Sequence, residues 1–399
     1  MRFKKFLSDI SLWLLIGVLC GVVGSAFSKT VGLATNIRLQ NGWLICFLPI
    51  AGLLSVAVCN FSKTQTVSTV DVFSSAKQDK KLPLLLAPAV FVATAITHIF
   101  GGSAGKEGAA LQIGGGILAV VSKIFKVPEK TRNTLVLCGM SGLFSAAFGT
   151  PFAAAVFAIE AVRLKKRDIL QIFPCIVSGM SAFVIALGLK TEPERFSIGA
   201  MPTISFKTCL IVLLISVSAA LVGAVFCKSL HLAHKLFKKA IHNEYLRIFV
   251  GGVIVVLLTV LIKNGDYNGS SAQKIAEIFE TGNVKYEAFA LKLIFTVITM
   301  GCGFKGGEIV PSLVIGSALG GAIAMLTGLA VPFGAAIGIA ALFCGVTKCP
   351  VTSVVICFEL FSFKAPIFII FAVLISLLLS GKSSLYGDIK PLLKIHSNK

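Results

Sequence analysis

Long apolar runs recur along the chain and are separated by short polar stretches. Residues 11–27 (SLWLLIGVLCGVVGSAF), 82–100, 248–262 and 365–380 contain no Asp, Glu, Lys or Arg. A helix needs roughly 20 apolar residues to cross a hydrocarbon core, and these runs approach that length. They lack the short alternating strands of a transmembrane barrel. The pattern therefore predicts an all-α polytopic membrane protein with about ten or more helical segments.

The first apolar run has a second interpretation. It follows the basic start MRFKK, and this order is typical of a secretory signal sequence. Its apolar part is long, however, and further apolar runs follow. We therefore interpret it as a retained first helix.

Composition and charge agree with a membrane setting. Of 399 residues, 56% are hydrophobic and 14% are charged, and 37 basic against 17 acidic residues give a formal net charge of +20. The basic residues gather in short loops, such as 77–81, 163–168 and 234–239. Such loops are typical of the cytoplasmic side and of contact with anionic lipids rather than nucleic acid. Raising the anion concentration at a pore mouth is a second possible role.

The sequence contains no metal- or cofactor-binding motif. The eleven cysteines occur singly, without CxxC pairs or histidines at ligand spacing. We expect them to be small buried apolar side chains, with no metal and no cofactor. His98 lies in an apolar run, and we expect it to be packed and hydrogen-bonded rather than part of a proton relay.

The two halves of the chain resemble each other. Residues 141–162 (SGLFSAAFGTPFAAAVFAIEAV) match residues 339–360 (IAALFCGVTKCPVTSVVICFEL). The spacing from Pro151 to Glu160 is nine residues, as it is from Pro350 to Glu359, and the offset between the copies is 199 residues. The chain is thus predicted to contain an internal repeat.

A second correspondence lies upstream in each half. A first glycine loop, residues 101–106 (GGSAGK), precedes Glu107, and a second glycine loop, residues 303–307 (GFKGG), precedes Glu308. The distance from each glutamate to the following proline is 44 and 42 residues, respectively. We expect two repeats of inverted topology, about 1–200 and 205–390, with broken helices that meet at the bilayer midplane.

Irregular backbone inside a bilayer is tolerated only where it lines a cavity or meets a ligand. The free N–H groups and the dipole at a helix start favour an anion, and glycine allows close approach. Tight packing would explain the glycines, and Lys106 could extend to the interface, but neither accounts for Glu107. We interpret Glu107 as a carboxylate that occupies an anion's position and leaves when protonated or displaced.

Three other intramembrane acids follow the same repeat. Glu308 is placed like Glu107, at a glycine-loop helix start. Glu160 and Glu359 each lie at the end of an apolar helix. We expect these last two to be structural, pairing with nearby basic residues or with backbone N–H groups.

These motifs resemble those of the CLC family of chloride channels and anion/proton antiporters. GSAGKEGAALQIG resembles the family's GREGP-type motif, FKGGEIVPSLVIG its GxFxP motif, and LYGDI (385–389) the segment with its anion-binding tyrosine. The resemblance implies a CLC-type fold in which Glu107 is the gate and carries the proton. It also implies an anion site formed by Gly105, Lys106, Gly108, Glu308, Ile309, Val310 and the Tyr386 hydroxyl, which is a neutral donor.

Two segments depart from the family pattern. The intracellular anion-binding loop, commonly GSGIP, is replaced by TQTVSTVDVF (64–73), where Ser68 or Thr69 could donate a hydroxyl. The second glutamate of chloride/proton antiporters, which follows the position of Glu160, is Ala161 here. The usual inner proton site is therefore missing.

The GxFxP region resembles the fluoride-exporting subclass, because Glu308 occupies a position that is apolar in most members. Fluoride is small and strongly hydrated, so its site must offer dense hydrogen bonding, and a protonated Glu308 can donate one bond. Two positions differ from that subclass, with Val310 in place of threonine and Lys106 in place of arginine.

The leading hypothesis is a fluoride/proton antiporter. A chloride/proton antiporter or a passive chloride channel of the same fold is the alternative. An intramembrane enzyme would need a nucleophile with its base or a set of metal ligands, and no such motif appears. The resemblance further implies a homodimer in a bacterial cell membrane. We expect one transmembrane domain over 1–399, without the nucleotide-binding CBS domains of some members.

Overall fold

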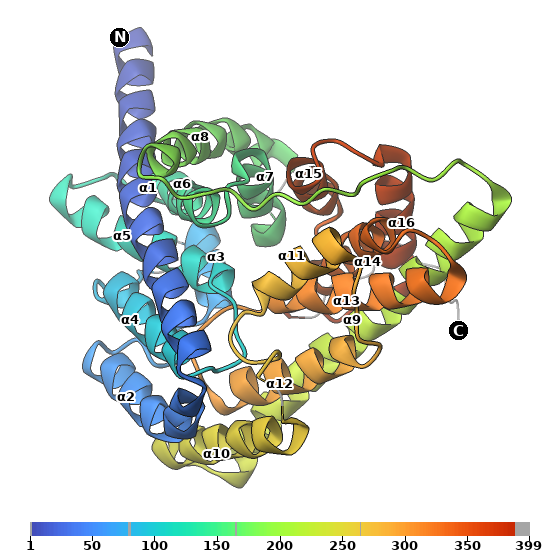
Figure 1. The fold of residues 1–399 in the computed structure, drawn as a ribbon. Coiled ribbons are helices and arrows are strands. Elements are labelled where there is room, and N and C mark those ends of the chain that lie inside the picture. The colour runs from blue at the N-terminus through green and yellow to red at the C-terminus, as the bar shows by residue number, and fades with distance from the viewer. Residues whose placement is uncertain (1, 79–80, 164–165, 264, 388–399) are drawn as a thin grey trace, which may run out of the picture.

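The computed structural model describes residues 2–78, 81–163, 166–263 and 265–387, and within these ranges every regular element is a helix (Figure 1). The α-helices are α1 (Arg2–Gln40), α2 (Leu48–Phe61), α3 (Thr69–Gln78), α4 (Leu86–Ile99), α5 (Glu107–Ile124), α6 (Glu129–Phe148), α7 (Pro151–Val162), α8 (Ile172–Gly188), α9 (Phe206–Ala240), α10 (Glu244–Ile262), α11 (Ala272–Thr281), α12 (Ala288–Cys302), α13 (Ile309–Thr327), α14 (Val331–Thr347), α15 (Pro350–Leu360) and α16 (Pro366–Leu379). Two short 3₁₀ helices are η1 (Gly42–Phe47) and η2 (Lys166–Gln171).

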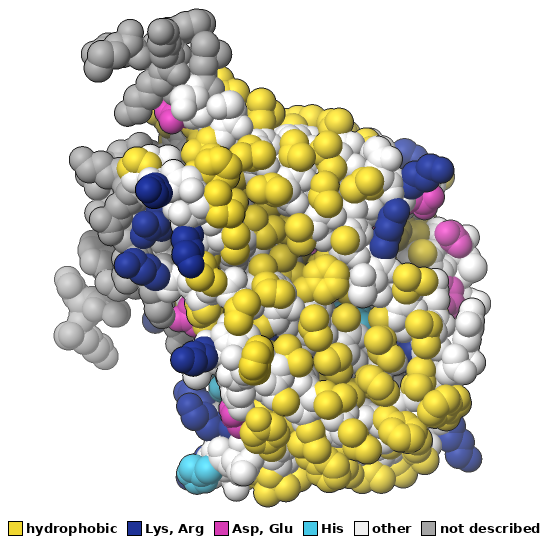
Figure 2. Space-filling model, turned by 90° about the vertical axis from the view of Figure 1, so that its left-hand side faces the viewer, with side chains coloured by type: hydrophobic (Ala, Val, Ile, Leu, Met, Phe, Trp, Pro, Cys, Tyr) yellow, Lys and Arg dark blue, Asp and Glu magenta, His cyan; other side chains and the backbone are white. Residues whose placement is uncertain are grey.

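The apolar helices fall into two groups by length. Seven helices of the described residues are long and apolar enough to cross a membrane, and six shorter apolar helices have 10–17 residues. The space-filling view shows a broad band of apolar side chains with Lys and Arg gathered along its edges (Figure 2). This arrangement is that of a polytopic membrane protein, as the sequence predicted.

The first apolar run forms α1, whose Ile16, Cys20 and Phe27 are buried in the main core. The helix packs against α6 and α8. The run therefore forms a helix that is packed into the main core. Of the basic loops predicted from the sequence, residues 79–80 and 164–165 lie outside the described residues. The prediction of a loop at 234–239 is wrong, because these residues form the last turns of α9, where the apolar helix continues into a basic end.

The two repeats are visible as matched contacts. α5 and α6 pack so closely that a Cβ atom on Gly114 would collide with the backbone of Gly139, and α13 and α14 show the same collision between Gly316 and Gly338. Small residues of this kind allow helix backbones to approach in a membrane. The two helix pairs are the hairpins that the sequence repeat predicted.

In each half a serine joins two neighbouring helices. Ser178 on α8 donates to the carbonyl oxygen of Cys138 on α6 at 2.8 Å. Ser376 on α16 donates to the carbonyl oxygen of Ala341 on α14 at 2.5 Å. α8 thus packs on α6 as α16 packs on α14, although the bonded residues are not at equivalent positions of the repeat.

α7 and α15 cap each other's first turns. Glu160, near the end of α7, accepts hydrogen bonds from the N–H groups of Val351 (3.1 Å) and Thr352 (2.7 Å) at the start of α15. Glu359, near the end of α15, accepts from Phe152 (3.2 Å) and Ala153 (2.7 Å) at the start of α7. Each helix end therefore lies beside the other's start, which is the inverted arrangement. Of the two pairings predicted for these acids, the backbone one is found.

The prediction of uniformly buried cysteines is wrong at two positions. All eleven are free thiols, and nine are buried, but Cys46 and Cys209 are exposed on the surface of the single chain. Both belong to apolar segments, in η1 and α9, whose outward faces carry exposed apolar side chains such as Trp43 and Leu210. A small apolar side chain is equally suited to a lipid-facing position, so hydrophobicity alone does not determine burial here.

Candidate functional site

The two glycine loops meet at the centre of the site. Gly105 and Gly307 pair through two backbone hydrogen bonds, each 2.7 Å from nitrogen to oxygen. A Cβ atom on Gly307 would collide with the backbone of Gly108. Glycine is therefore required for this contact between loops, and the Gly105 N–H is used for it rather than left for an anion. The pairing holds the starts of α5 and α13 face to face.

Glu107 is the first residue of α5, as the sequence predicted, and its side chain is only 1% exposed. Neither carboxylate oxygen has a hydrogen-bond partner among the described residues. The carboxylate lies close to Gly105, because a Cβ atom added to that glycine would be 2.8 Å from Oε2 and 3.0 Å from Pro311 Cδ. A helix start supports a negative charge at this position. No hydrogen bond to a described residue therefore fixes the carboxylate in place.

Glu308 occupies the corresponding place at the start of α13, where it is the residue before the first helical turn. Its Oε2 atom would lie 3.4 Å from a Cβ atom placed on Gly108 of α5. Ile309 and Val310 are buried, and as first-turn residues they have N–H groups without partners inside the helix. The structure therefore gathers Gly105, Glu107, Gly108, Glu308, Ile309 and Val310, which the sequence had assigned to one site.

A cavity of about 290 Å³, here called the Glu107 cavity, borders Glu107. Its lining includes Lys106, Glu107, Glu194 and Val310, together with residues of α1 and α11. Lys106 Nζ lies 4.0 Å from Glu194 Oε1, with both side chains partly exposed. Glu194 belongs to the polar segment between α8 and α9, and no motif in the sequence pointed to it.

Tyr386 lies apart from this cavity, in an aromatic cluster. Its ring packs edge-on against Phe73 of α3 with centroids 4.9 Å apart, and lies 6.2 Å from the ring of Phe157 of α7. The hydroxyl oxygen is buried and has no hydrogen-bond partner among the described residues. A buried phenol without a partner is available to a ligand.

Ser68 and Thr69 are both engaged at the start of α3. Ser68 Oγ donates to Asp71 Oδ2 at 2.8 Å, and Thr69 Oγ1 accepts from Gln112 Nε2 at 3.0 Å. Lys305 of the second glycine loop donates to the carbonyl oxygens of Gln65 and Val67, each at 3.3 Å. Lys305 therefore joins the segment 64–73, which departs from the family pattern, to the second glycine loop. No motif in the sequence had pointed to this lysine.

His98 is fully buried on α4. Its Nδ1 lies 2.8 Å from the carbonyl oxygen of Thr94, and its Nε2 has no partner within the described part of the chain. The packed and hydrogen-bonded interpretation is thus supported.

Lys292 is a further charged residue that sequence reasoning missed. It lies in the apolar run AFALKLIFTVITMGC of α12 and is fully buried. The available signal was a lone ionisable residue inside a membrane segment, which by default indicates a functional position.

Comparison with known proteins decides the family. The sequence profile of the family described as "Voltage gated chloride channel" matches residues 63–381. The chain belongs to this family. A "Chloride/fluoride channel protein" of Pseudomonas syringae pv. tomato is 29% identical over 94% of this chain and 86% of its own length. An "H(+)/Cl(-) exchange transporter ClcA" of Vibrio cholerae is 25% identical, covering 90% of this chain and 82% of the relative.

Solved structures of the family have the same fold. A crystal structure of "a CLC-type fluoride/proton antiporter" matches with a TM-score of 0.92 and 30% identity, covering 97% of this chain and 98% of that one. "A slow cyanobacterial Cl-/H+ antiporter" matches with a TM-score of 0.80 and 18% identity, covering 93% and 94% of the two chains. The CLC-type fold that the motifs implied is thus confirmed.

Proposed function

We propose that this CLC-family chain exchanges fluoride for protons across the membrane, with Glu107 as the moving gate. The observation that supports this proposal most is the state of Glu107. Its carboxylate is buried and without a partner, at a helix start and beside a cavity. A carboxylate held in this way competes with an anion for the helix start, and it leaves that position when it takes up a proton.

Fluoride is proposed rather than chloride because of Glu308. It is a second hydrogen-bonding side chain at the start of α13, opposite the start of α5, and the neutral acid donates a hydrogen bond. A small, strongly hydrated anion needs more such donors than a larger one does. The relative and the structure named above that are 29% and 30% identical both carry fluoride in their descriptions.

Orientation follows from charge. Basic loops prefer the cytoplasmic side, so the start of α1 and the loop after α3 are assigned to the cytoplasm. The Glu107 cavity is lined by Ser28, Val31 and Thr35, toward the other end of α1. We therefore assign this cavity to the outer face, where Glu107 exchanges protons with the medium.

The test is a flux assay in liposomes that contain the purified protein, with fluoride or chloride gradients and internal pH recorded together. We expect fluoride movement to drive protons in the opposite direction and to exceed chloride movement. Glu107→Gln is expected to abolish proton movement, because an amide cannot carry a proton in this cycle. Glu277→Gln, a surface acid of α11 that is 46% exposed, serves as the matched control and should behave as the parent does.

Each alternative gives a different result in the same assay. Chloride moving with protons more rapidly than fluoride would indicate the chloride/proton antiporter, and anion flux without a pH change would indicate a passive channel. Unaltered proton coupling in Glu107→Gln would contradict the gate assignment.

We also infer that two copies associate in the bacterial cell membrane. Several large apolar side chains of α8 and α16 are exposed on the single chain, among them Val184, Ile367, Leu374 and Leu378. These surfaces suit either lipid or a second copy. The other partners proposed for each subunit are the halide, the proton and the lipid bilayer.

A further inference from the structure

Lys292 of α12 joins two loops that are far apart in the sequence. It is fully buried, and its Nζ donates to the carbonyl oxygens of Gly269 (2.7 Å) and Tyr267 (3.2 Å) and to the hydroxyls of Ser103 (2.9 Å) and Ser271 (3.0 Å). All four acceptors are uncharged. Burying an ammonium group is costly, and these hydrogen bonds offset part of that cost. The side chain thus connects the first glycine loop to the 265–271 loop.

One face of α12 holds Ser103. Lys292, Thr296 and Thr299 follow one another at helical spacing on the same face. Thr296 Oγ1 lies 3.0 Å from Ser103 Oγ, and Thr299 Oγ1 accepts from the Ser103 N–H at 3.1 Å. All four residues are fully buried. Ser103 is therefore fixed at both its backbone and its side chain.

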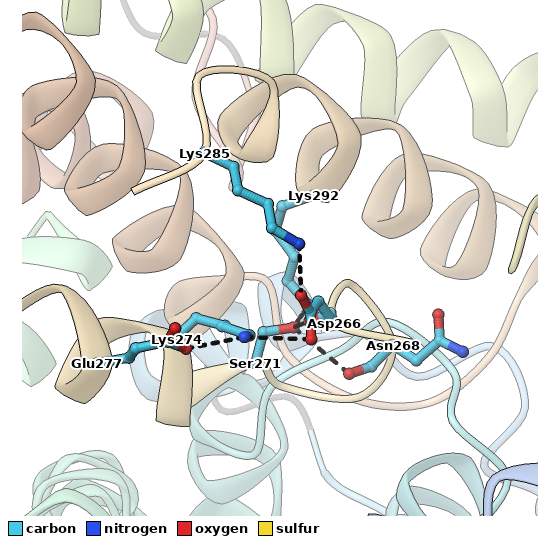
Figure 3. Close-up of polar contacts among 7 residues, drawn as sticks. All are labelled: Asp266, Asn268, Ser271, Lys274, Glu277, Lys285 and Lys292. Carbon is cyan, nitrogen blue, oxygen red and sulfur yellow. Dashed lines mark hydrogen bonds and ion pairs between the residues drawn. The ribbon is translucent and has the colours of Figure 1, made fainter. Parts of the chain in front are cut away.

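The 265–271 loop is itself firmly supported (Figure 3). At its surface Asp266 pairs with Lys274 at 3.1 Å and with Lys285 at 3.2 Å. The backbone carbonyl oxygen of Asp266 accepts a hydrogen bond from Ser271 Oγ at 2.8 Å. The loop provides a rigid platform for Lys292.

The same platform touches the gate region directly. Gly269 N–H donates to the carbonyl oxygen of Gly101 at 3.2 Å. Ser270 of the loop and Ala272, the first residue of α11, line the Glu107 cavity. Ser103 precedes Glu107 by only four positions in the chain. A shift of Ser103 would therefore move the start of α5.

We propose that Lys292 is a positioning residue for the gate. It fixes the first glycine loop against the 265–271 loop, so that the Glu107 carboxylate returns to one position after each proton transfer. Without it the start of α5 has several positions, and anions pass in cycles that move no proton. The inference rests on the transport function proposed above.

The test compares Lys292→Met with the parent. Methionine keeps the length of the side chain and removes its three donors. In nanodiscs, hydrogen exchange at the Ser103 and Gly105 amides should become at least about tenfold faster, because their closed state is less favoured. In liposomes, the number of protons moved per anion should fall to about half or less of the parent value, since a misplaced group loses its productive geometry.

Lys285→Met is the matched control. It removes a lysine of the segment before α12 that pairs with Asp266 at the surface of the loop. This lysine is 56% exposed, so the pair contributes little, and Asp266 stays paired with Lys274. We expect parental exchange and a parental proton-to-anion ratio. If this control lowers the ratio as much as Lys292→Met does, the effect belongs to the loop in general, and the assignment to Lys292 is wrong.

A second variant keeps the proposal testable if Lys292→Met does not fold. Ser103→Ala removes one of the four acceptors and leaves Lys292 bonded to the 265–271 loop. It should shift both readouts in the same direction by a smaller amount. Parental exchange and a parental ratio in a folded Lys292→Met, or in Ser103→Ala where only that variant folds, would overturn the inference.

The two readouts separate this inference from the proposed function. Hydrogen exchange does not depend on transport. If the parent moves no anion, the proposed function fails, although the effect of Lys292 on loop exchange can still be measured. If the parent couples anions to protons and the Lys292 variants do so equally well, only the positioning role fails.

Discussion

Glu107 and Glu160 are both acids in apolar segments, and their surroundings differ. Glu160 accepts from two backbone N–H groups and from the Thr352 hydroxyl, whereas both oxygens of Glu107 lack a partner among the described residues. A carboxylate with satisfied oxygens is fixed in place. One without partners is free to move when its charge changes. This contrast supports the gate role proposed for Glu107 and a structural role for Glu160.

Glu308 is the residue on which ion preference should depend. We predict that Glu308→Ala lowers the preference for fluoride over chloride by about tenfold or more, because a hydrogen bond to a charged group is worth roughly 1.5–3 kcal/mol. Glu308→Gln retains an N–H donor and should lose less. Competitive flux in liposomes measures the ratio. A Glu308→Ala protein with the parental preference would remove Glu308 from the fluoride site.

At the scale of elements, α7 and α15 have 12 and 11 residues. At 1.5 Å per residue each is about 18 Å long or less, well short of a hydrocarbon core of about 30 Å. Their first-turn N–H groups would be unsatisfied inside the membrane, and the glutamate of the partner helix satisfies two of them in each case. Each short helix therefore helps to stabilise the start of the other.

Removing one of these caps should weaken the pair. We predict that Glu160→Ala and Glu359→Ala each lower the free energy of unfolding by about 1–2 kcal/mol, the usual effect of losing a capping side chain. Thermal unfolding in detergent would show this as a lower midpoint. Glu280→Ala, which removes an exposed acid of α11, is the control. Equal midpoints for all three variants would show that the caps contribute no stability.

At the scale of the whole molecule, the two halves share one main core. The main cluster of buried apolar residues takes members from α1 to α16, and Phe157 of the first half lies 6.1 Å from Phe343 of the second, ring centre to ring centre. Figure 1 shows α15 beside α7, one of the places where the two halves meet. The site lies where the halves meet, so neither half contains it alone.

Exposed apolar faces on α8 and α16 lead to a prediction about assembly. In lipid nanodiscs, native mass spectrometry should report a particle of two chains. The reason is that these apolar faces can pack against the same faces of a second chain as well as against lipid. A mass of one chain across the accessible range of protein concentration would contradict the homodimer.

The sequence predicted the helix starts well. α5 begins at Glu107, α13 follows Glu308, and α7 and α15 begin at Pro151 and Pro350. Proline and glycine act locally on the backbone, so their effect can be read from a few neighbouring residues. The sequence did not predict the contacts of Lys292, Lys305 or Glu194, because each of these side chains meets a segment that is distant along the chain.

What the sequence determined by itself is the set of elements and the chemistry they carry. Apolar runs set the membrane helices, the repeat set their pairing into two halves, and Glu107 and Glu308 were marked by their glycine loops. Only the tertiary structure decided which groups meet. The bond between Gly105 and Gly307 and the exchange of caps between Glu160 and Glu359 join residues about 200 positions apart. Contacts of this kind depend on how whole helices pack, and no local pattern encodes them.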